Sequence, residues 1–541
     1  MTSRALVWLK RDLRLLDHAP LAAAAGFDAA VALYVIEPEW LASPEFGAAQ
    51  LRFVLDSLAQ LRAAGAVRGL PVLVRVGSLP EVFETLRREV PFDTLLSHEE
   101  TGSGWTYARD LRVADWCGGR GVPWQEFSQT GVVRRLKTRS GWAGRWQARM
   151  SAPVVAVPAF EGARQREAIA ALDLGELPTL AALGVAPGVQ TVQPGGERAA
   201  WAVLEDFLHR RGHDYRRALS SPLSATEGCS RLSPHLAWGT ISMRAVHQAT
   251  EARIAALKAG DLGDRRFAHA LRGFAGRLRW HCHFMQKLED EPGIEFRNFA
   301  RVYDGLRPGD DGGPPWTELE QARFEAWCTG RSGYPMVDAC MRSLCATGWL
   351  NFRMRAMLVS FASYHLWLHW RPTGLFLARQ FLDFEPGIHW SQMQMQSGTT
   401  GINTLRIYSP TRQALEHDPN GEFIRRWLPE LARVPLPHLA EPWRMPEAVQ
   451  AAAGCRIGFD YPAPIADDKT AVKHAKERLY GLRARSEARA EAAAIQHKHG
   501  SRKSGLPPSG GRKTAAAGSK AAAKPQAASN QLDLFATDAN E

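Results

Sequence analysis

The first 130 residues alternate short apolar runs with helix-compatible stretches, and this alternation is the strongest constraint on the fold. The runs lie at residues 5–9, 31–36, 71–76, 94–97 and 124–127. Between the second and third runs, residues 48–63 repeat leucine and valine at spacings of three and four, which is typical of a helix. Runs that are apolar on both faces and separated by helices are typical of a parallel sheet covered on both sides. We therefore predict a doubly wound α/β domain over residues 1–135.

This predicted domain lacks the usual nucleotide-binding loops. No G-x-G-x-x-G or Walker A pattern follows any of the apolar runs. The sequence thus indicates an α/β domain without a dinucleotide fingerprint.

The remaining residues divide into three parts by composition. At 541 residues the chain is too long for one core, so a second domain is expected. Residues 136–200 are rich in Ala, Pro and Gly and are interpreted as an interdomain connection. Residues 201–482 have helical spacing and no comparable strand pattern, which predicts an all-α domain with helices over 201–210, 264–288, 335–346 and 351–370. Residues 483–541 are rich in Ala, Lys, Arg, Ser, Gly and Pro, which predicts a disordered tail.

The charge and the cysteines limit the classes of function. The net charge is +11, and ten Lys or Arg face two Glu between Arg483 and Lys524, so most of the excess belongs to the tail. Basic segments of this kind favour polyanions, above all nucleic acid. The seven cysteines form no C-x-x-C pair, which argues against a secreted disulfide scaffold and a zinc ribbon. We expect a monomer in a reducing cytoplasm, with no metal and no membrane span.

Two local patterns in the helical part could bind an anionic ligand. Residues 228–236 place hydroxyls and backbone donors around Arg231 just before a helix, which suits either an anion cradle or an ordinary capped helix start. Arg353 and Arg355 are two apart, so they point to different faces of a helix: one toward a ligand, the other toward solvent or a phosphate. A buried arginine needs a carboxylate, and Asp383 is the candidate partner of Arg355 in a ligand site or a structural ion pair.

Four segments together resemble the photolyase/cryptochrome family of blue-light flavoproteins. They are residues 5–17, residues 229–236, residues 332–355 with their G-Y-P-M-V-D-A-C-M-R sequence, and the C-terminal blocks 406–410 and 421–431. The resemblance extends from about residue 4 to 480. It implies an α/β antenna domain, a helical domain that holds a folded FAD, and light-driven electron transfer from reduced flavin to a pyrimidine dimer flipped out of DNA. It leaves open whether folate, deazaflavin or nothing serves as the antenna chromophore.

The resemblance also assigns roles to individual residues. Tyr215 matches a residue near the FAD phosphates, and Arg355 with Asp383 matches the ion pair beside the flavin ring. Trp280 and Arg353 match lesion-facing residues. The remaining matches are Ser230, Leu232 and Ser233 in the phosphate cradle, Glu385 near the ribityl chain, Trp370 in the middle of the electron relay, and His389 facing flavin N5. A histidine there could change flavin protonation across physiological pH.

Several positions depart from the pattern of the family's repair enzymes. Arg277 stands where they carry Glu, and Phe352 where they carry Asn. The second lesion-stacking Trp falls at residues 393–395, and the proximal relay Trp is Met393 unless Trp390 serves. The distal relay residue is either Trp316 or Tyr303. A deoxyribodipyrimidine photolyase is the first hypothesis, and a cryptochrome-like photoreceptor without repair activity is the second. The sequence leaves open which DNA lesion, if any, is repaired.

A short motif near the C-terminus resembles the peptide by which bacterial repair and replication proteins bind the sliding clamp. It consists of Gln531, Leu532, Leu534 and Phe535, with Asp533 between them. The basic segment before it would add salt-sensitive DNA affinity. A clamp-associated accessory protein with a vestigial flavin is a third hypothesis, and a solvated tail with an incidental apolar patch is the alternative for the motif itself.

Overall fold

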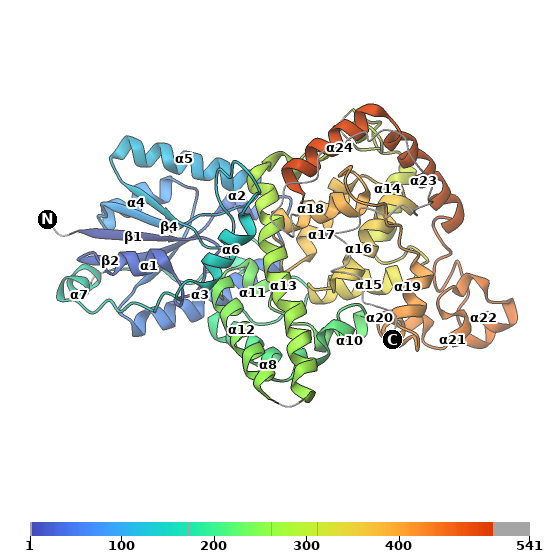
Figure 1. The fold of residues 1–541 in the computed structure, drawn as a ribbon, viewed down its shortest axis with the longest axis horizontal. Helices are drawn as coiled ribbons and strands as arrows, with labels where there is room; N and C mark the ends of the chain where they lie inside the picture. Colours follow the sequence, from blue (N-terminus) through green and yellow to red (C-terminus); the bar gives the residue numbers. More distant parts are fainter. Residues whose placement is uncertain (1–2, 171, 261, 311, 501–541) are drawn as a thin grey trace, which may run out of the picture.

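The predicted strands form one parallel sheet at the N-terminal end of the molecule (Figure 1). The computed structural model describes residues 3–170, 172–260, 262–310 and 312–500. The strands are β1 (Arg4–Leu9), β2 (Ala29–Ile36), β3 (Val72–Val76), β4 (Thr94–His98) and β5 (Trp124–Phe127), in the order β3-β2-β1-β4-β5. All five apolar runs are therefore confirmed as strands.

Helices cover both faces of the sheet, as a doubly wound fold requires. Val7 and Leu9 of β1 pack toward α1 (Ala19–Ala24) and α3 (Ala48–Val67), whereas Leu6 and Trp8 pack toward α4 (Glu81–Glu89) and α5 (Gly104–Arg120). The strand order reverses between β1 and β4. Loops that follow the carboxyl ends of these two strands consequently meet in one crevice, where open α/β sheets bind ligands or, in this chain, contact the second domain.

The second domain is helical, as predicted. Among the described residues from 197 to 499 there is no strand, only an isolated bridge between Ile457 and Tyr461. Its helices are α8 (Glu197–His209), α9 (Tyr215–Ala218), α10 (Pro222–Gly228), α11 (Ser233–Ala237), α12 (Met243–Ala259), α13 (Leu262–Asp290), α14 (Glu318–Cys328), α15 (Pro335–Thr347), α16 (Phe352–Ser360), α17 (Trp370–Gln380), α18 (Pro386–Ser397), α19 (Pro410–His417), α20 (Glu422–Trp427), α21 (Leu436–Leu439), α22 (Glu447–Ala453), α23 (Asp468–Arg483) and α24 (Ser486–His499).

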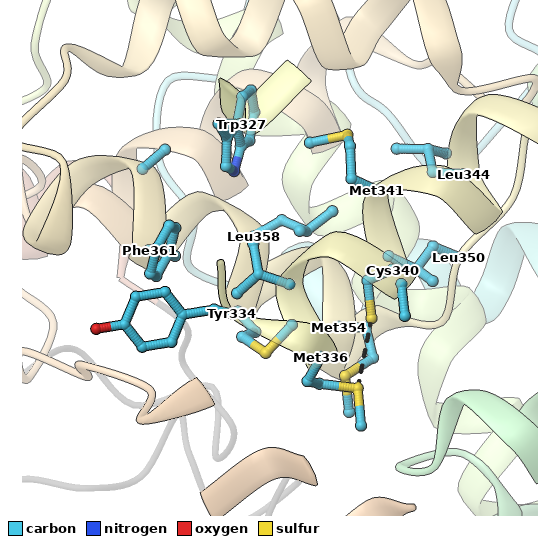
Figure 2. Packing of buried hydrophobic residues seen from close by; sticks show 14 of the residues in the cluster. Trp327, Tyr334, Met336, Cys340, Met341, Leu344, Leu350, Met354, Leu358 and Phe361 are labelled. Carbon is cyan, nitrogen blue, oxygen red and sulfur yellow. Dashed lines mark hydrogen bonds between the residues drawn. The ribbon is translucent and has the colours of Figure 1, made fainter. Parts of the chain in front are cut away.

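A sulfur-rich core fixes α15 and α16 against each other (Figure 2). Met336, Cys340, Met341 and Met354 are fully buried there, and the Cys340 thiol lies 3.8 Å from the Met336 sulfur. Flexible thioethers fill irregular space between helices well. This packing sets the orientation of α16, the helix that carries Arg353 and Arg355.

The segment interpreted as an interdomain connection contains two helices. Within residues 136–200, α6 (Trp142–Ser151) and α7 (Ala163–Ile169) are helical. Trp142, Trp146 and Met150 recur at every fourth position, and all three are buried in the core of the helical domain. Three large apolar residues on one face supply enough burial for this short helix within the connection.

The helix predicted over residues 351–370 is interrupted. Helix α16 ends at Ser360, a π-helical turn spans Phe361–His365, and α17 begins at Trp370. Trp367 adopts a left-handed conformation with φ of 59°, and the His369 ring accepts a hydrogen bond from the N–H of Arg371 to cap α17. A left-handed residue cannot continue an α-helix, so the chain turns here.

The beginning of the predicted disordered tail is also a helix. In α24 the Ile495 side chain is buried, and the Glu491 carboxylate accepts hydrogen bonds from the N–H groups of Arg301 and Val302. The prediction of disorder is therefore wrong for residues 486–499, because a few anchoring contacts outweigh the polar composition. The clamp-like motif at residues 531–535 lies outside the described residues.

None of the helices that the structure describes combines the length and the apolar character needed to cross a bilayer.

Candidate functional site

A cavity of about 300 Å³ lies inside the helical domain. Residues of α9, α11, α13, α16, α17 and α18, with the loops beside them, form its walls. It collects most of the predicted site residues, namely Tyr215, Ser230, Ser233, Trp280, Arg355, Asp383, Glu385 and His389. Leu232, Arg353 and Trp370 are not among its lining residues.

The expected ion pair between Arg355 and Asp383 is present in the cavity wall. The two guanidinium nitrogens Nη1 and Nη2 donate to the two carboxylate oxygens at 3.0 and 2.8 Å. The guanidinium also lies 4.0 Å from the centre of the Phe381 ring, and Arg355 Nε donates to the Leu350 carbonyl at 2.6 Å. Bidentate geometry with a third hydrogen bond holds both charged groups rigidly.

A second ion pair lies in the same cavity, and no sequence pattern predicted it. His281 Nε2 is 2.6 Å from the Glu385 carboxylate. Burial alone would lower the pKa of His281, but the charge of Glu385 raises it to about 10, so the ring is cationic at neutral pH. The two residues are 104 positions apart, and His281 merely follows Trp280 on α13, so no sequence spacing pointed to the pair.

The loop before α11 divides its side chains between cavity and core. Ser230 and Ser233 line the cavity, while the Leu232 side chain is fully buried in the hydrophobic core beneath them. Arg231 adopts a left-handed conformation with φ of 60°, and its guanidinium lies 3.9 Å from the centre of the Trp349 ring. Leu232 therefore anchors the cradle, whereas the two hydroxyls face the ligand space.

His389 is a neutral ring that donates a hydrogen bond to the backbone in this setting. Its Nε2 lies 2.9 Å from the Gly374 carbonyl oxygen, which requires a proton on Nε2 and leaves Nδ1 as the acceptor. Burial lowers the pKa of His389 to about 4. The ring is therefore neutral at physiological pH, and its influence on flavin protonation stays a prediction.

Besides Leu232, two other predicted residues lie outside the cavity. Arg353, on the other side of α16 from Arg355, lines a surface groove with Arg406, Lys476 and Tyr480. Trp370 is fully buried, and its indole N–H donates to the Asn298 side chain at 2.7 Å.

The Trp370 ring centre is 5.8 Å from that of Trp390, which in turn lies 4.8 Å from the cavity-lining His389. Trp390 is thus placed between Trp370 and the cavity, whereas Met393 lines the cavity itself.

A buried group in the first domain combines the ligand types of a metal site in one polar network. Asp12, His18 and His98 lie within coordinating distance of one another. Asp12 Oδ2 is 2.7 Å from His98 Nδ1 and 3.0 Å from His18 Nε2. His18 Nδ1 accepts a hydrogen bond from the N–H of Leu21 at 3.2 Å, which fixes the ring orientation. The group is explained as a polar network.

The polar groups of the helical cavity fit a flavin. Asn351 Oδ1 and Gln392 Nε2 are buried, line the cavity and have no hydrogen-bond partner among the described atoms. An unpaired buried acceptor and donor are costly unless a ligand pairs with them. Two compensated carboxylates, two serine hydroxyls and aromatic walls add sites for phosphate, ribityl and ring atoms, as FAD requires.

The fold and the cavity define a two-domain flavin-binding protein with an α/β and a helical part. A family model described as "FAD binding domain of DNA photolyase" matches residues 274–481, and one described as "DNA photolyase" matches residues 5–142. The chain belongs to the photolyase/cryptochrome family, and FAD is its cofactor.

Similar proteins carry both names used in this family. The chain is 29% identical to a "Cryptochrome DASH" of Gloeobacter violaceus, over 86% of this chain and 93% of that protein. It is 28% identical to a "Deoxyribodipyrimidine photo-lyase" of Halobacterium salinarum, over 85% and 96%. The fold matches the crystal structure of a bacterial class III photolyase from Agrobacterium tumefaciens with a TM-score of 0.71 and 24% identity, covering 90% of this chain and 98% of that one.

Proposed function

We propose that the protein is an FAD-dependent deoxyribodipyrimidine photolyase that reverses ultraviolet pyrimidine lesions in DNA. The observation that supports this most is that Trp280 lines the same cavity as the Arg355–Asp383 and His281–Glu385 pairs. A base stacked on Trp280 would share one enclosed space with the flavin. Relatives named deoxyribodipyrimidine photo-lyase point the same way.

The cavity wall is suited to hold a flipped pyrimidine lesion. The Trp280 ring is braced by Phe284 and His283, whose ring centres lie 5.6 and 5.1 Å away. Arg277, one turn earlier on α13, supplies donors for the carbonyl oxygens of a pyrimidine. The chemistry supplied by bound FAD is a light-driven electron for the lesion. The chain's own residues would orient the lesion, hold the two cavity carboxylates in place through Arg355 and His281, and exclude water with the rings of Phe381 and Phe384.

A repair assay on the purified holoprotein tests this proposal. Oligonucleotides with one cyclobutane dimer or one (6-4) photoproduct are illuminated with blue light after photoreduction, and restored thymine is measured by chromatography with dark samples as controls. Trp280→Ala should lower the yield at least tenfold, while Trp280→Phe, which still offers a stacking face, should keep most of it. Restoration of neither lesion by protein with bound, photoreducible flavin would contradict the proposal.

A cryptochrome-like photoreceptor is the second candidate. The observation in its favour is that Arg277 and Phe352 both line the cavity where the family's repair enzymes carry Glu and Asn. This reading predicts complete photoreduction of the flavin and no thymine in the same assay. It also accords with the similarity to proteins named Cryptochrome DASH.

We further propose that the C-terminal motif binds a bacterial sliding clamp and that damaged DNA is the main partner. The motif residues Gln531, Leu532, Leu534 and Phe535, joined to a basic segment, support this from the sequence. Deletion of residues 531–535 should abolish clamp binding, whereas deletion of residues 536–541 should not. Equal clamp binding by both deletion variants would refute the proposed role of the motif in clamp binding.

The proposed setting is a monomer in the cytoplasm. All seven cysteines are free, which suits a reducing compartment. Light scattering of the holoprotein would show a mass near 60 kDa for a monomer, and a doubled mass would refute it.

A further inference from the structure

We infer that Arg11 and Gln50, both in the N-terminal α/β domain, are positioning residues for the flavin site in the other domain. They act on residues 381–385, the segment that joins α17 to α18. This inference rests on FAD binding and goes beyond the proposed repair activity, so it holds for a photolyase and a photoreceptor alike.

The segment presents its side chains to the cavity. Phe381, Asp383, Phe384 and Glu385 all line it. Asp383 and Glu385 are the two carboxylates held by Arg355 and His281. The placement of both charged groups therefore depends on the path of five consecutive backbone residues.

The carbonyls of this segment are held largely from outside the cavity. Arg11 Nη1 donates to the Phe384 carbonyl at 2.9 Å. Gln50 Nε2 donates to the carbonyls of Ala378 and Phe381 at 2.9 and 3.0 Å. Trp238, next to the N-terminal domain, donates its indole N–H to the Leu382 carbonyl at 2.9 Å.

The Arg11 donor is itself fixed in place. Its guanidinium lies 4.5 Å from the centre of the Trp238 ring, its Nε is 3.8 Å from the Glu100 carboxylate, and its backbone carbonyl accepts from Gln129 at 2.6 Å. Gly239, with φ of 64°, permits this approach, because a Cβ there would lie 2.0 Å from the Arg11 carbonyl oxygen. A rearranged Arg11 side chain would have to leave the Trp238 ring and the Glu100 carboxylate, while its backbone is held by Gln129.

Gln50 is equally constrained. Only 1% of this residue is exposed, at the start of α3. The neighbouring Gly47 approaches α17 so closely that a Cβ would lie 2.3 Å from the Arg379 carbonyl oxygen. The N-terminal domain thus presents rigid donors to a short connecting segment that would otherwise have several backbone conformations.

Asp383 makes the position of charge in the cavity sensitive to the backbone of residues 381–385. Its carboxylate is separated from the main chain by one methylene group, so a shift of the backbone moves the charge by a similar distance. Removing the Arg11 donor leaves the Phe384 carbonyl without this partner and lets Asp383 and Glu385 move relative to Arg355 and His281. FAD binding and the electrostatic environment of the flavin should both change.

The test uses the full-length chain with Arg11→Gln, Arg11→Lys and Gln50→Met. We expect Arg11→Gln and Gln50→Met each to weaken FAD binding about tenfold, a loss equivalent in free energy to about one well-placed hydrogen bond, although Gln50→Met removes two backbone hydrogen bonds. The visible circular dichroism and the reduction potential of the remaining bound flavin should shift as well. Arg11→Lys keeps a cationic donor and should restore at least part of both signals.

Arg62→Gln is the matched control. Arg62 is in the same domain and also donates to carbonyls, those of Val72, Leu174 and Gly175, but far from segment 381–385. If Arg11→Gln and Gln50→Met change FAD affinity and flavin circular dichroism no more than Arg62→Gln, the inference is refuted. It is also refuted if Arg11→Lys behaves like Arg11→Gln. Should Arg11→Gln fail to fold, the comparison of Gln50→Met with Arg62→Gln decides alone.

Discussion

Asp383 is the residue on which the charge balance of the cavity depends most directly, because its carboxylate neutralises Arg355 at two points. We predict that Asp383→Asn weakens FAD retention at least tenfold, since the guanidinium then faces the flavin space without a counter-charge. Flavin content after gel filtration measures this.

Glu430→Gln provides the control for Asp383→Asn. It breaks a pair of similar geometry between Arg342 and Glu430, which lies away from the cavity. Full flavin occupancy in Asp383→Asn, or an equal loss in Glu430→Gln, would contradict the assigned role.

The ion pair of His281 and Glu385 should stabilise the fold at neutral pH and lose this contribution as the pH becomes alkaline. The folded state raises the pKa of His281 from 6.5 to about 10. The contribution of the ion pair to the free energy of unfolding is therefore complete below pH 6.5 and is lost as pH rises toward 10. The difference in unfolding free energy between wild type and His281→Gln should therefore shrink over this range. Urea titrations at pH 6, 8 and 10 would measure it, and a difference that does not vary with pH would exclude the charged pair.

Residue roles were predictable where two strong local signals coincided. The Arg355–Asp383 pair followed from a helical arginine that needs a carboxylate, and the serines of the cradle from hydroxyls before a helix. His281 with Glu385 could not be predicted, because the approach of α13 to the segment before α18 is a property of tertiary packing. The neutral state of His389 likewise depends on its burial by tertiary packing, which no pattern around residue 389 reveals.

At the scale of elements, helix α16 lies between the cavity and a surface groove and presents one arginine to each. Arg355 belongs to the cavity, and Arg353 lines a groove that α23 completes with Lys476. This groove also carries Arg406 and two tyrosines, the combination of cations and aromatic rings that binds nucleic acid. The spacing of two residues on a helix predicted this division, although not which arginine would face the ligand.

The groove should contribute to DNA affinity without regard to the lesion. Lys476→Ala should weaken binding of damaged and undamaged duplexes alike and reduce the salt slope by about 1. Lys473→Ala is the control, because Lys473 is on the same helix and pairs with Glu477 but does not line the groove. Fluorescence anisotropy at several salt concentrations measures both, and identical slopes for the two variants would remove the groove from the DNA interface.

Helices and strands with a regular pattern of apolar residues were predictable from the sequence. Elements that depend on a few tertiary contacts were not. Strands β1, β2 and β3 are apolar on nearly every residue, so local sequence sufficed for them, while β4 and β5 followed from the alternation with helices. Helix α24 depends on Glu491 and Ile495 reaching a distant loop, and the turn at Phe361–His365 depends on the left-handed Trp367. Such features come from contacts that a window of sequence does not contain.

For the whole molecule, the uneven charge predicts two separable modes of DNA binding. Truncation after Gly500 removes six Lys or Arg, at 502, 503, 512, 513, 520 and 524. We expect lower affinity for any DNA and a salt slope shallower by up to about 5, since each phosphate contact releases a counterion. Flavin content and the visible spectrum should stay as in the full chain. An unchanged slope would mean that the tail does not touch DNA.

The hydrogen bond from Arg11 to the Phe384 carbonyl has an evolutionary consequence. Every residue type offers a backbone carbonyl, so position 384 can change its side chain and still accept this bond. The donor has no such freedom, because only a long cationic side chain at position 11 spans the distance. Chimeras that exchange the first domain between family members should therefore succeed or fail according to the loop after β1, whatever the recipient carries at the position of Phe384.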